Sequence, residues 1–405
     1  MTHWQLALLV ISGFLVFFAL FGAIHHVFFV LVYFFRCKKR RYSPQPTHSF
    51  KILIPAHNES LGLKGVLECC LALDYPRELF SVVVVADNCT DDTAQIARDC
   101  GVTCLERFDT TRRGKGEALE WAIPQALADH NSDAVMILDA DCFLAPQALR
   151  ACDFELAKGN QVLQMSYLVS NADESFRCYA MGLARFIENQ LYYWPKSKAG
   201  LSIAMLGTGM VFHRDVFVKC PWQAGGLTED YEYGLDLMQN NFRPVFVGEI
   251  GLVSPFPVEM KQLETQRSRW ASGVLQGVRK TFGPLLCRGI CRGNIVTVDA
   301  AVSMLYVSRP LILLQVFLAG IMAVITRILV PNVWGQTIFW AWSATLALYF
   351  AYAMTGVLVM GLTWRRLKFL MLSPAFVLKY MALTAKSLLN RRPKEWERTP
   401  RKPEE

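Results

Sequence analysis

Two aspartates stand one residue apart directly after a short apolar run. Asp139 and Asp141 follow residues 134–138, which are all apolar. Carboxylate oxygens are the hard ligands that Mg²⁺ and Mn²⁺ prefer in proteins. Such an ion neutralises a diphosphate and helps it to leave. The pattern is common, however, and by itself a solvated loop explains it equally well.

The pattern around these aspartates predicts a layered α/β domain. Short strand-like runs alternate with segments of helical pattern. The predicted strands are residues 50–54, 81–86, 102–105 and 134–138, and the predicted helices between them are residues 60–73, 91–99 and 115–128. This alternation is typical of a parallel sheet that is covered by helices on both faces.

Polar residues come where three of the predicted strands end. Asn58 follows the first strand, Asp87 follows the second, and Asp139 and Asp141 follow the fourth. Ligands of parallel sheets bind beyond the carboxyl ends of the strands. We therefore predict one binding site at this edge of the sheet.

Two common nucleotide-binding motifs are missing. No G-x-x-x-x-G-K-[ST] sequence occurs, which excludes a P-loop, and no G-x-G-x-x-G follows the first strand, which excludes a dinucleotide-dependent dehydrogenase. Gly207-Thr208-Gly209 is an isolated GxG and only a weak signal. His57 and His213 fit no metal-ligand spacing and are interpreted as structural.

The first 35 residues predict a membrane-spanning helix. They contain no Asp, Glu, Lys or Arg, and about 20 apolar residues suffice to cross a bilayer. Five basic residues follow between positions 36 and 41, whereas a cleaved signal peptide carries its charges before the apolar run. The positive-inside rule places this basic end in the cytoplasm.

Two further uncharged runs, residues 310–326 and 332–364, predict a pair of spanning helices that leave the cytoplasm and return to it. The next segment, residues 367–389, contains Pro374, Lys379 and Lys386. If this segment spanned the membrane, the basic tail after it would lie outside, against the positive-inside rule. We therefore predict an amphipathic helix in the membrane interface.

The composition agrees with a membrane protein. Charged residues make up 19% and hydrophobic residues 53% of the chain, whereas a soluble domain is about 25% charged. The 42 basic and 34 acidic residues give a net charge of +8, which we assign largely to the membrane surface rather than to nucleic-acid binding. The twelve cysteines are predicted to be free thiols, since most fall in the predicted cytoplasmic region.

Several short motifs occur in an order that resembles the membrane-embedded family 2 glycosyltransferases, which include cellulose, hyaluronan and poly-N-acetylglucosamine synthases and ceramide glucosyltransferases. The motifs are Ile54-Pro55-Ala56-His57-Asn58-Glu59, Val85-Ala86-Asp87-Asn88-Cys89-Thr90-Asp91, Gly114-Lys115-Gly116, Asp139-Ala140-Asp141, Thr228-Glu229-Asp230 and Gln266-Arg267-Ser268-Arg269-Trp270. The resemblance implies an α/β GT-A domain at residues 43–290. A spanning helix with its basic flank precedes it at 1–42, and interfacial helices, two spanning helices and a basic tail follow at 291–405.

The resemblance also implies roles for the residues at the sheet edge. Asp87 would accept a hydrogen bond from the uracil ring of a UDP-sugar, and Lys115 would face the diphosphate, although a solvated loop charge is the simpler interpretation of that lysine. Asp139 would contact both nucleotide and metal, and Asp141 would hold the Mg²⁺ or Mn²⁺ ion more directly. The nucleotide pocket would be completed by Ala56, Asn58 and Glu59.

Asp230 is the predicted general base, which takes the proton from the acceptor hydroxyl. The alternative is a helix N-cap, because a carboxylate is favoured at a helix N-terminus. Gln266, Arg269 and Trp270 share one face of a predicted helix at residues 258–282. The resemblance implies that they meet the diphosphate and the acceptor, and an interfacial amphipathic helix is the alternative.

The predicted function is inverting sugar transfer from a UDP-sugar to a growing polysaccharide with a β-linkage, in the inner membrane of a bacterium. Transfer of a single sugar to a lipid is the alternative, and an inactive membrane scaffold is a more remote one. Three spanning helices are few for an export channel. A partner subunit or a homo-oligomer would then have to supply the rest of it.

Overall fold

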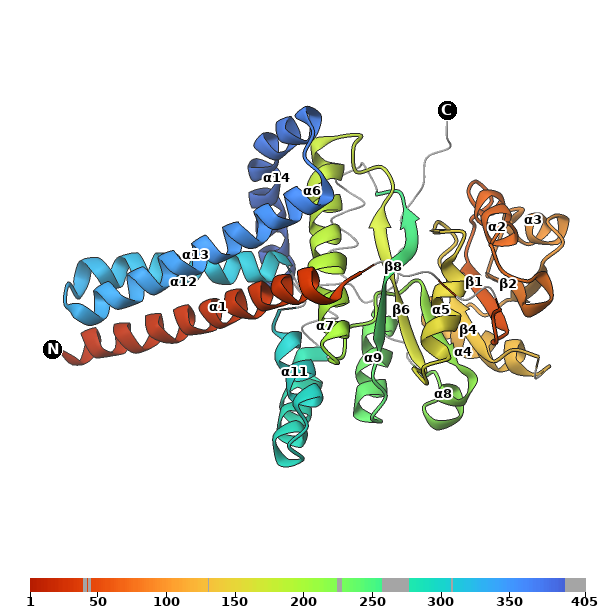
Figure 1. Cartoon of the computed structure of the whole chain (residues 1–405), viewed down its shortest axis with the longest axis horizontal. Helices are drawn as coiled ribbons and strands as arrows, with labels where there is room; N and C mark the ends of the chain where they lie inside the picture. The colour runs from red at the N-terminus through yellow and green to blue at the C-terminus, as the bar shows by residue number, and fades with distance from the viewer. Residues whose placement is uncertain are drawn as a thin grey trace.

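The computed structural model describes residues 1–38, 42, 45–129, 131–223, 228–256, 277–306 and 309–389. It consists of a bundle of three long helices that ends against an α/β domain (Figure 1). The N-terminus lies at the far end of the bundle. A helical segment at residues 176–198 stands between the bundle and the sheet of the α/β domain.

The α/β domain contains an eight-stranded sheet with the order β3-β2-β1-β4-β7-β6-β8-β5. β1, β2, β3 and β4 are parallel, whereas β7 runs antiparallel between β4 and β6, and β5 is antiparallel to β8. The strands are β1 (Phe50–Ala56), β2 (Phe80–Asp87), β3 (Thr103–Arg107), β4 (Ala134–Ile137), β5 (Phe143–Leu144), β6 (Val162–Val169), β7 (Met210–His213) and β8 (Val245–Ser254).

The four predicted strands are present, and the mostly parallel GT-A type of sheet is confirmed. The other four strands lie beyond residue 138, where no strand was predicted, and two of them, β5 and β7, are antiparallel. β5 has only two residues, too few to show a pattern. β6 has a register shift between Met165 and Ser166 that breaks its alternation.

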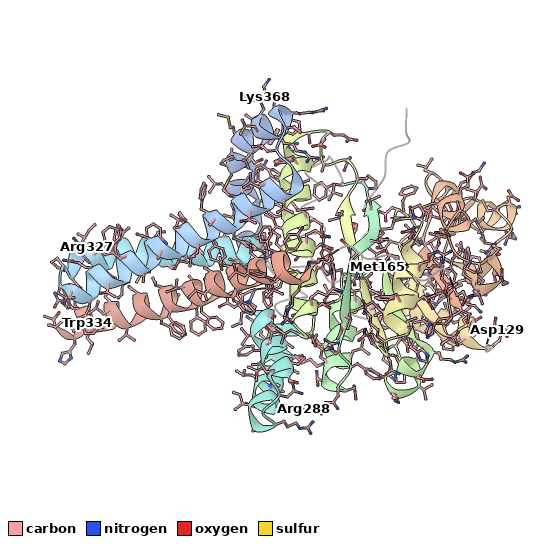
Figure 2. The ribbon with its side chains drawn as sticks, viewed as in Figure 1. Asp129, Met165, Arg288, Arg327, Trp334 and Lys368 are labelled. Carbon is pink, nitrogen blue, oxygen red and sulfur yellow. The ribbon has the colours of Figure 1, made fainter. Side chains whose placement is uncertain are left out.

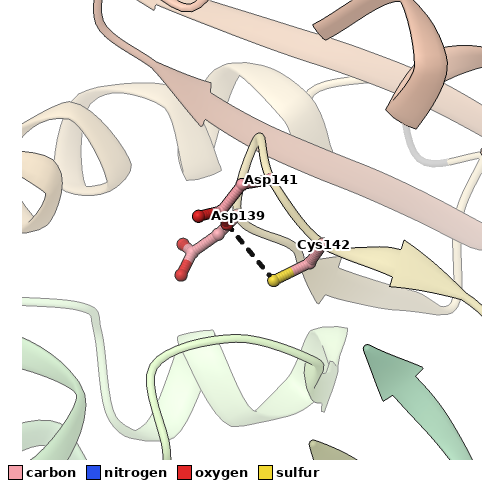
Figure 3. A group of neighbouring side chains, drawn as sticks. All are labelled: Asp139, Asp141 and Cys142. Atoms are coloured by element: carbon pink, nitrogen blue, oxygen red, sulfur yellow. Dashed lines mark hydrogen bonds between the residues drawn. The ribbon is translucent and has the colours of Figure 1, made fainter. Parts of the chain in front are cut away.

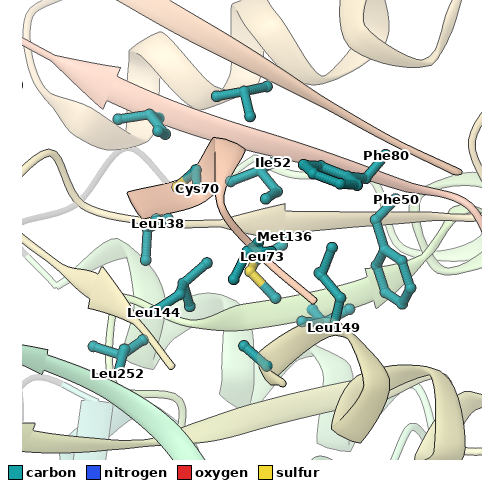
Figure 4. Close-up of a cluster of buried hydrophobic side chains, with 14 of the residues drawn as sticks. Phe50, Ile52, Cys70, Leu73, Phe80, Met136, Leu138, Leu144, Leu149 and Leu252 are labelled. Carbon is teal, nitrogen blue, oxygen red and sulfur yellow. The ribbon is translucent and has the colours of Figure 1, made fainter. Parts of the chain in front are cut away.

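Helices cover both faces of the sheet. They are α2 (Leu63–Leu71), the 3₁₀ turn η1 (Arg77–Leu79), α3 (Thr93–Asp99), α4 (Lys115–Leu127), α5 (Ala148–Leu156), α8 (Arg214–Lys219) and α9 (Glu229–Gln239). Alternate residues of β1 enter opposite cores: Ile52 packs with α2 and α5, and Leu53 packs with α4 and α9. Figure 4 shows the first of these cores.

Two predicted helices begin later than the sequence suggested. The backbone N–H of Ser60 donates to Oδ2 of Asp91 at 3.1 Å, and that of Thr93 donates to Oδ1 of Asp91 at 3.0 Å. These contacts hold a turn before each helix, so that α2 begins at Leu63 and α3 begins at Thr93.

The helical segment between bundle and sheet consists of α6 (Phe176–Phe186), the π-helical segment η2 (Ile187–Tyr193) and α7 (Trp194–Lys198). One side of this segment packs against the bundle through Leu183, Ile187 and Leu191, which form a buried cluster with residues of α1 and α13. The other side contacts β6 and β8. The segment therefore joins the two parts of the molecule.

Three helices are long and apolar enough to cross a membrane: α1 (His3–Arg36), α12 (Arg309–Leu329) and α13 (Val333–Met360). They lie where the sequence predicted spanning helices. Figure 2 places Arg327 and Trp334 together at the end of the bundle remote from the α/β domain. The bundle interior contains Val16 and Ala19 of α1 and Val316, Ala319 and Ala323 of α12.

The last predicted span is shorter than the uncharged run suggested. Gly361 has a φ of +90° and ends α13 at Met360, and a separate helix, α14 (Trp364–Leu389), begins three residues later. α14 packs on α6 and runs across the direction of α12 and α13 (Figure 1). Its place in the membrane interface stays a prediction. The short α11 (Ile295–Met304) also lies at the domain end of the bundle.

Candidate active site

Asp139 and Asp141 lie together just beyond the end of β4. Figure 3 shows them with Cys142, and one ligand atom from each of the three residues lies within 4.8 Å of the others. The Cys142 thiol donates to Oδ1 of Asp141 at 3.4 Å and is buried, whereas both carboxylates are partly exposed. Two accessible carboxylates fit a hard divalent cation such as Mg²⁺ or Mn²⁺.

Lys115 is the first residue of α4 and reaches across to the aspartates. Its Nζ donates to Oδ1 of Asp139 and to the carbonyl oxygen of Gly207, both at 2.5 Å. Burial alone lowers the pKa of Lys115, but the carboxylates of Asp139, Glu229 and Asp230 raise it overall. The lysine is therefore a fixed positive charge within an acidic cluster, not the solvated loop charge that the simpler interpretation proposed.

Asp230 is the second residue of α9, and its carboxylate lies against Gly207. A Cβ atom built on Gly207 would be only 2.9 Å from Oδ2 of Asp230. Burial raises the pKa of Asp230 above its ordinary value, although the Lys115 ammonium lowers it in part. The N-cap of α9 is Thr228, so Asp230 does not occupy the capping position that the alternative interpretation requires.

The Gly207-Thr208-Gly209 loop supports this cluster. Both glycines have positive φ values, +87° and +64°. The Thr208 hydroxyl accepts from the backbone N–H of Asp139 at 3.0 Å. The buried Gln164 side chain of β6 accepts from the Leu206 N–H and donates to the Thr208 carbonyl, both at 2.8 Å. The isolated GxG was the only sequence signal for this loop, and nothing in the sequence singled out Gln164.

Asp87 ends β2 and is buried, with an exposed fraction of 7%. Arg107 Nη1 donates to its Oδ1 at 2.6 Å, and Asn88 Nδ2 donates to the same oxygen at 3.0 Å. Both hydrogen bonds end on Oδ1 of Asp87, and neither involves Oδ2. Sequence reasoning did not find Arg107, because an arginine at the end of a short strand carries no distinctive pattern.

The other residues assigned to the nucleotide pocket lie beside Asp87. Ala56 pairs with Ala86 in the sheet. Asn58 has a φ of +54°, and its side-chain oxygen accepts from the backbone N–H of Thr90 at 2.7 Å. The Glu59 N–H donates to Thr93 Oγ1 at 2.8 Å. These contacts hold the loops around the predicted nucleotide pocket.

His57 and His213, the two histidines that were interpreted as structural, both make contacts within the fold. His57 Nδ1 lies 2.7 Å from the Asp87 carbonyl oxygen, and the His213 side chain accepts from the Asp215 N–H at the start of α8. Gln266, Arg269 and Trp270 lie outside the described residues, so the structure places none of them. All twelve cysteines are free thiols, as predicted.

Strand-end carboxylates and a lysine thus lie together at the edge of a GT-A type sheet. Residues 46–273 match the family model described as glycosyltransferase-like family 2. The chain therefore belongs to this family.

Curated relatives agree with this family. A probable glycosyltransferase, YdaM of Bacillus subtilis, is 26% identical over 55% of this chain and 54% of its own length. The cellulose synthase 1 catalytic subunit of Komagataeibacter xylinus is 23% identical over 69% of this chain and 37% of its own. A beta-monoglucosyldiacylglycerol synthase of Synechocystis is 23% identical over 56% and 47%. The chain thus matches about half or less of the length of these relatives.

Among solved structures, the mannosyltransferase PcManGT from Pyrobaculum calidifontis, in complex with GDP-Man and Mn²⁺, is similar over 94% of this chain and 99% of that chain. The TM-score is 0.59 and the sequence identity 18%. This likeness supports the assignment of the fold.

Proposed function

We propose that the chain is a membrane-embedded, inverting glycosyltransferase that uses a UDP-sugar and forms a β-linkage. The observation that carries the proposal is the meeting of Asp139, Lys115 and Asp230 at the edge of the sheet where β2 also ends in the buried Asp87. This arrangement combines a site for a diphosphate and its counter-ion with a carboxylate whose pKa is raised.

Each residue has a distinct part in the proposed reaction. Asp87 would accept from the uracil ring, and Lys115 would offset the charge of the diphosphate. Asp139 and Asp141 would hold a divalent cation, which neutralises the leaving diphosphate when bound. Asp230 would accept the proton of an acceptor hydroxyl.

The acceptor oxygen then bonds to the anomeric carbon as the bond from that carbon to the phosphate oxygen breaks. The electron pair of the broken bond leaves with UDP. A single displacement inverts the configuration, so an α-linked donor gives a β-linked product. No covalent intermediate is required.

We propose that α1, α12 and α13 cross the membrane and that the α/β domain lies in the cytoplasm. The basic residues between positions 36 and 41 follow α1, and Arg365, Arg366 and Lys368 follow α13. By the positive-inside rule both helix ends face the cytoplasm. In a bacterial cell the inner membrane fits this orientation.

The packing of the bundle bears on the acceptor. In the described residues the bundle interior is closely packed, and Gly320 lies so close to the Trp342 ring that an added Cβ would meet it at 2.7 Å. Ser12 and Thr326 bond to each other inside the bundle at 2.6 Å. This packing favours a membrane-resident lipid acceptor. The polysaccharide predicted from the resemblance would need a partner subunit or second copy to complete a channel.

A panel of radiolabelled UDP-sugars tests the proposal. The purified chain in detergent micelles with Mn²⁺ and dioleoylglycerol should release UDP from one of them. Extraction into chloroform would identify a glycolipid, and retention by a size filter would identify a polymer. If no UDP-sugar turned over, either with dioleoylglycerol or with an oligosaccharide as the acceptor, the proposal would be contradicted.

A further inference from the structure

The helix segment α6–η2–α7 presents different chemistry on its two sides. Leu183, Ile187 and Leu191 face the bundle. Arg185 reaches the sheet, where its guanidinium lies 4.8 Å from the centre of the Tyr167 ring. Glu188 contacts Arg185 and also accepts from the Tyr193 hydroxyl at 3.5 Å. The segment stands between the bundle and the sheet that carries Asp139 and Asp141 (Figure 1).

The π-helical part of the segment holds Tyr167 in place. The Tyr167 N–H donates to Oδ1 of the buried Asn189 at 2.8 Å. The next residue, Gln190, donates to the Ser166 hydroxyl at 3.2 Å and to the Gly248 carbonyl at 3.0 Å. These contacts fall at the register shift that follows Met165. π-Helical turns and β-bulges both occur often at functional sites, where a bulge re-aims a side chain.

Tyr167 lies on the side of the sheet that leads to the metal-binding pair. Its hydroxyl bonds to Ser254 Oγ at 2.7 Å. β8 pairs with β5, which begins directly after Asp141 and Cys142. Burial raises the pKa of Tyr167, and the nearby Cys142 and Asp141 add to the rise. The ring is therefore within electrostatic reach of the carboxylate that would hold the metal.

The charges beside the ring remain accessible. The side chain of Arg185 is 23% exposed and that of Glu188 is 14% exposed. One guanidinium nitrogen, Nη1, contacts Oε2 of Glu188 at 3.4 Å, and an arginine has five N–H donors. A long contact that uses one nitrogen leaves donors for a ligand. The adjacent Glu188 carboxylate would accept hydrogen bonds from hydroxyl groups and would repel an anion.

We propose that Tyr167, Arg185 and Glu188 form a subsite that binds a neutral hydroxylated acceptor and aims one hydroxyl at Asp230. Arg185 donates to acceptor oxygens, Glu188 accepts from acceptor hydroxyls, and Tyr167 supports the guanidinium with its ring. The vicinal oxygens of a sugar and the glycerol group of a diacylglycerol both offer this chemistry. This inference rests on the proposed glycosyltransferase function.

The test replaces Arg185 with glutamine and separates acceptor binding from donor binding. Initial rates are measured with dioleoylglycerol in mixed micelles and, separately, with cellotetraose. For the acceptor that is used, Arg185→Gln should raise KM at least tenfold, because a hydrogen bond to a charged group contributes about 1.5–3 kcal/mol. UDP affinity by calorimetry and slow donor hydrolysis without acceptor should stay at parental values.

Arg177→Gln is the matched control. Arg177 is on the same helix, and its guanidinium lies 5.6 Å from the Phe176 ring. It should behave as the parent. Arg185→Lys should recover part of the loss, and Glu188→Gln should raise the acceptor KM without changing UDP affinity. The acceptor whose KM rises, dioleoylglycerol or cellotetraose, identifies the source of the hydroxyl.

Two results would overturn the subsite. One is an unchanged acceptor KM in Arg185→Gln while the parent transfers sugar, which leaves the proposed function intact. The other is an equal loss of UDP affinity in that variant, which would place Arg185 in the donor site or in the folding core. If the parent turns over no UDP-sugar, the proposed function fails and the subsite fails with it.

Discussion

The Nζ atom of Lys115 lies 2.5 Å from Oδ1 of Asp139 and the same distance from the carbonyl oxygen of Gly207. One ammonium group thus joins the first turn of α4, the end of β4 and the loop that leads into β7. The carboxylates of Asp139, Glu229 and Asp230 raise the pKa of Lys115, so its charge persists at physiological pH.

Replacement of Lys115 by methionine should weaken UDP binding. A hydrogen bond to a charged group contributes about 1.5–3 kcal/mol, or roughly a tenfold to hundredfold change in affinity. Calorimetry with UDP and Mn²⁺ measures the change. Lys64→Met, at a side chain that is 71% exposed on α2, serves as the control. Parental UDP affinity in Lys115→Met would show that the lysine does not contact the diphosphate.

Asp230→Asn should abolish most turnover while UDP affinity stays near the parental value. General-base catalysis contributes about a hundredfold to ten-thousandfold, or roughly 3 to 5 kcal/mol of barrier. Asparagine keeps the shape of the side chain but cannot take the proton. Asp236→Asn, at an exposed residue of the same helix, is the matched control. Near-parental turnover of Asp230→Asn would reject Asp230 as the base and move the search to Glu229 or Asp236.

Activity should fall at low pH in a way that follows Asp230. The base must be ionised, and burial raises its pKa above the ordinary aspartate value of about 3.9. The acid limb of kcat/KM should therefore lie above that value, with activity lost as pH falls through the raised pKa. A pH–rate profile at constant ionic strength measures the limb, and a limb at the ordinary value would argue against a buried base.

The raised pKa of Asp230 also affects the stability of the fold. A carboxyl with a raised pKa in the folded state costs stability above that pKa, because the fold must then hold a partly desolvated charge. Asp230→Asn should accordingly unfold at a higher temperature than the parent at neutral pH, whereas Asp236→Asn should show a smaller change. Thermal unfolding monitored by circular dichroism compares them. A lower Tm for Asp230→Asn would mean that the carboxylate stabilises the fold.

Activity should require a divalent cation held by Asp139 and Asp141. Chelation should abolish turnover, and added Mn²⁺ or Mg²⁺ should restore it. Asp141→Ala should need far more metal for half-maximal activity, because it removes one of two hard ligands. Asp92→Asn, at an exposed aspartate before α3, should keep the parental metal dependence. Full activity of Asp141→Ala in chelator would refute the metal site.

Gly207→Ala should disturb both the fold and the catalytic carboxylate. The φ of +87° costs a residue with a Cβ about 1–2 kcal/mol, and the new Cβ would press on Asp230 Oδ2. Gly200→Ala isolates the first effect, since Gly200 has a φ of +85° and no atom within 4 Å of an added Cβ. Turnover should fall in Gly207→Ala alone. Equal effects in both variants would mean that only backbone strain matters.

The sequence by itself determined the first half of the sheet and the positions of the polar strand ends. Apolar runs such as 81–86 show their period locally, and a polar residue after a buried strand falls at the ligand edge of a parallel sheet. The three membrane-length helices were also evident, because their length and lack of charge are local properties. Asp87, Asp139 and Asp141 could be assigned to one edge on this basis.

Only the tertiary structure decided which residues meet at that edge. Lys115 and Asp139 are 24 positions apart, and Gly207 is 92 positions from Lys115. Their contacts depend on the insertion of the short antiparallel β7 next to β4, which no local pattern predicts. The Arg107–Asp87 ion pair and the Arg185–Tyr167 contact arise in the same way. Strand order and helix packing bring such pairs together, and neither is encoded in the spacing of any one segment.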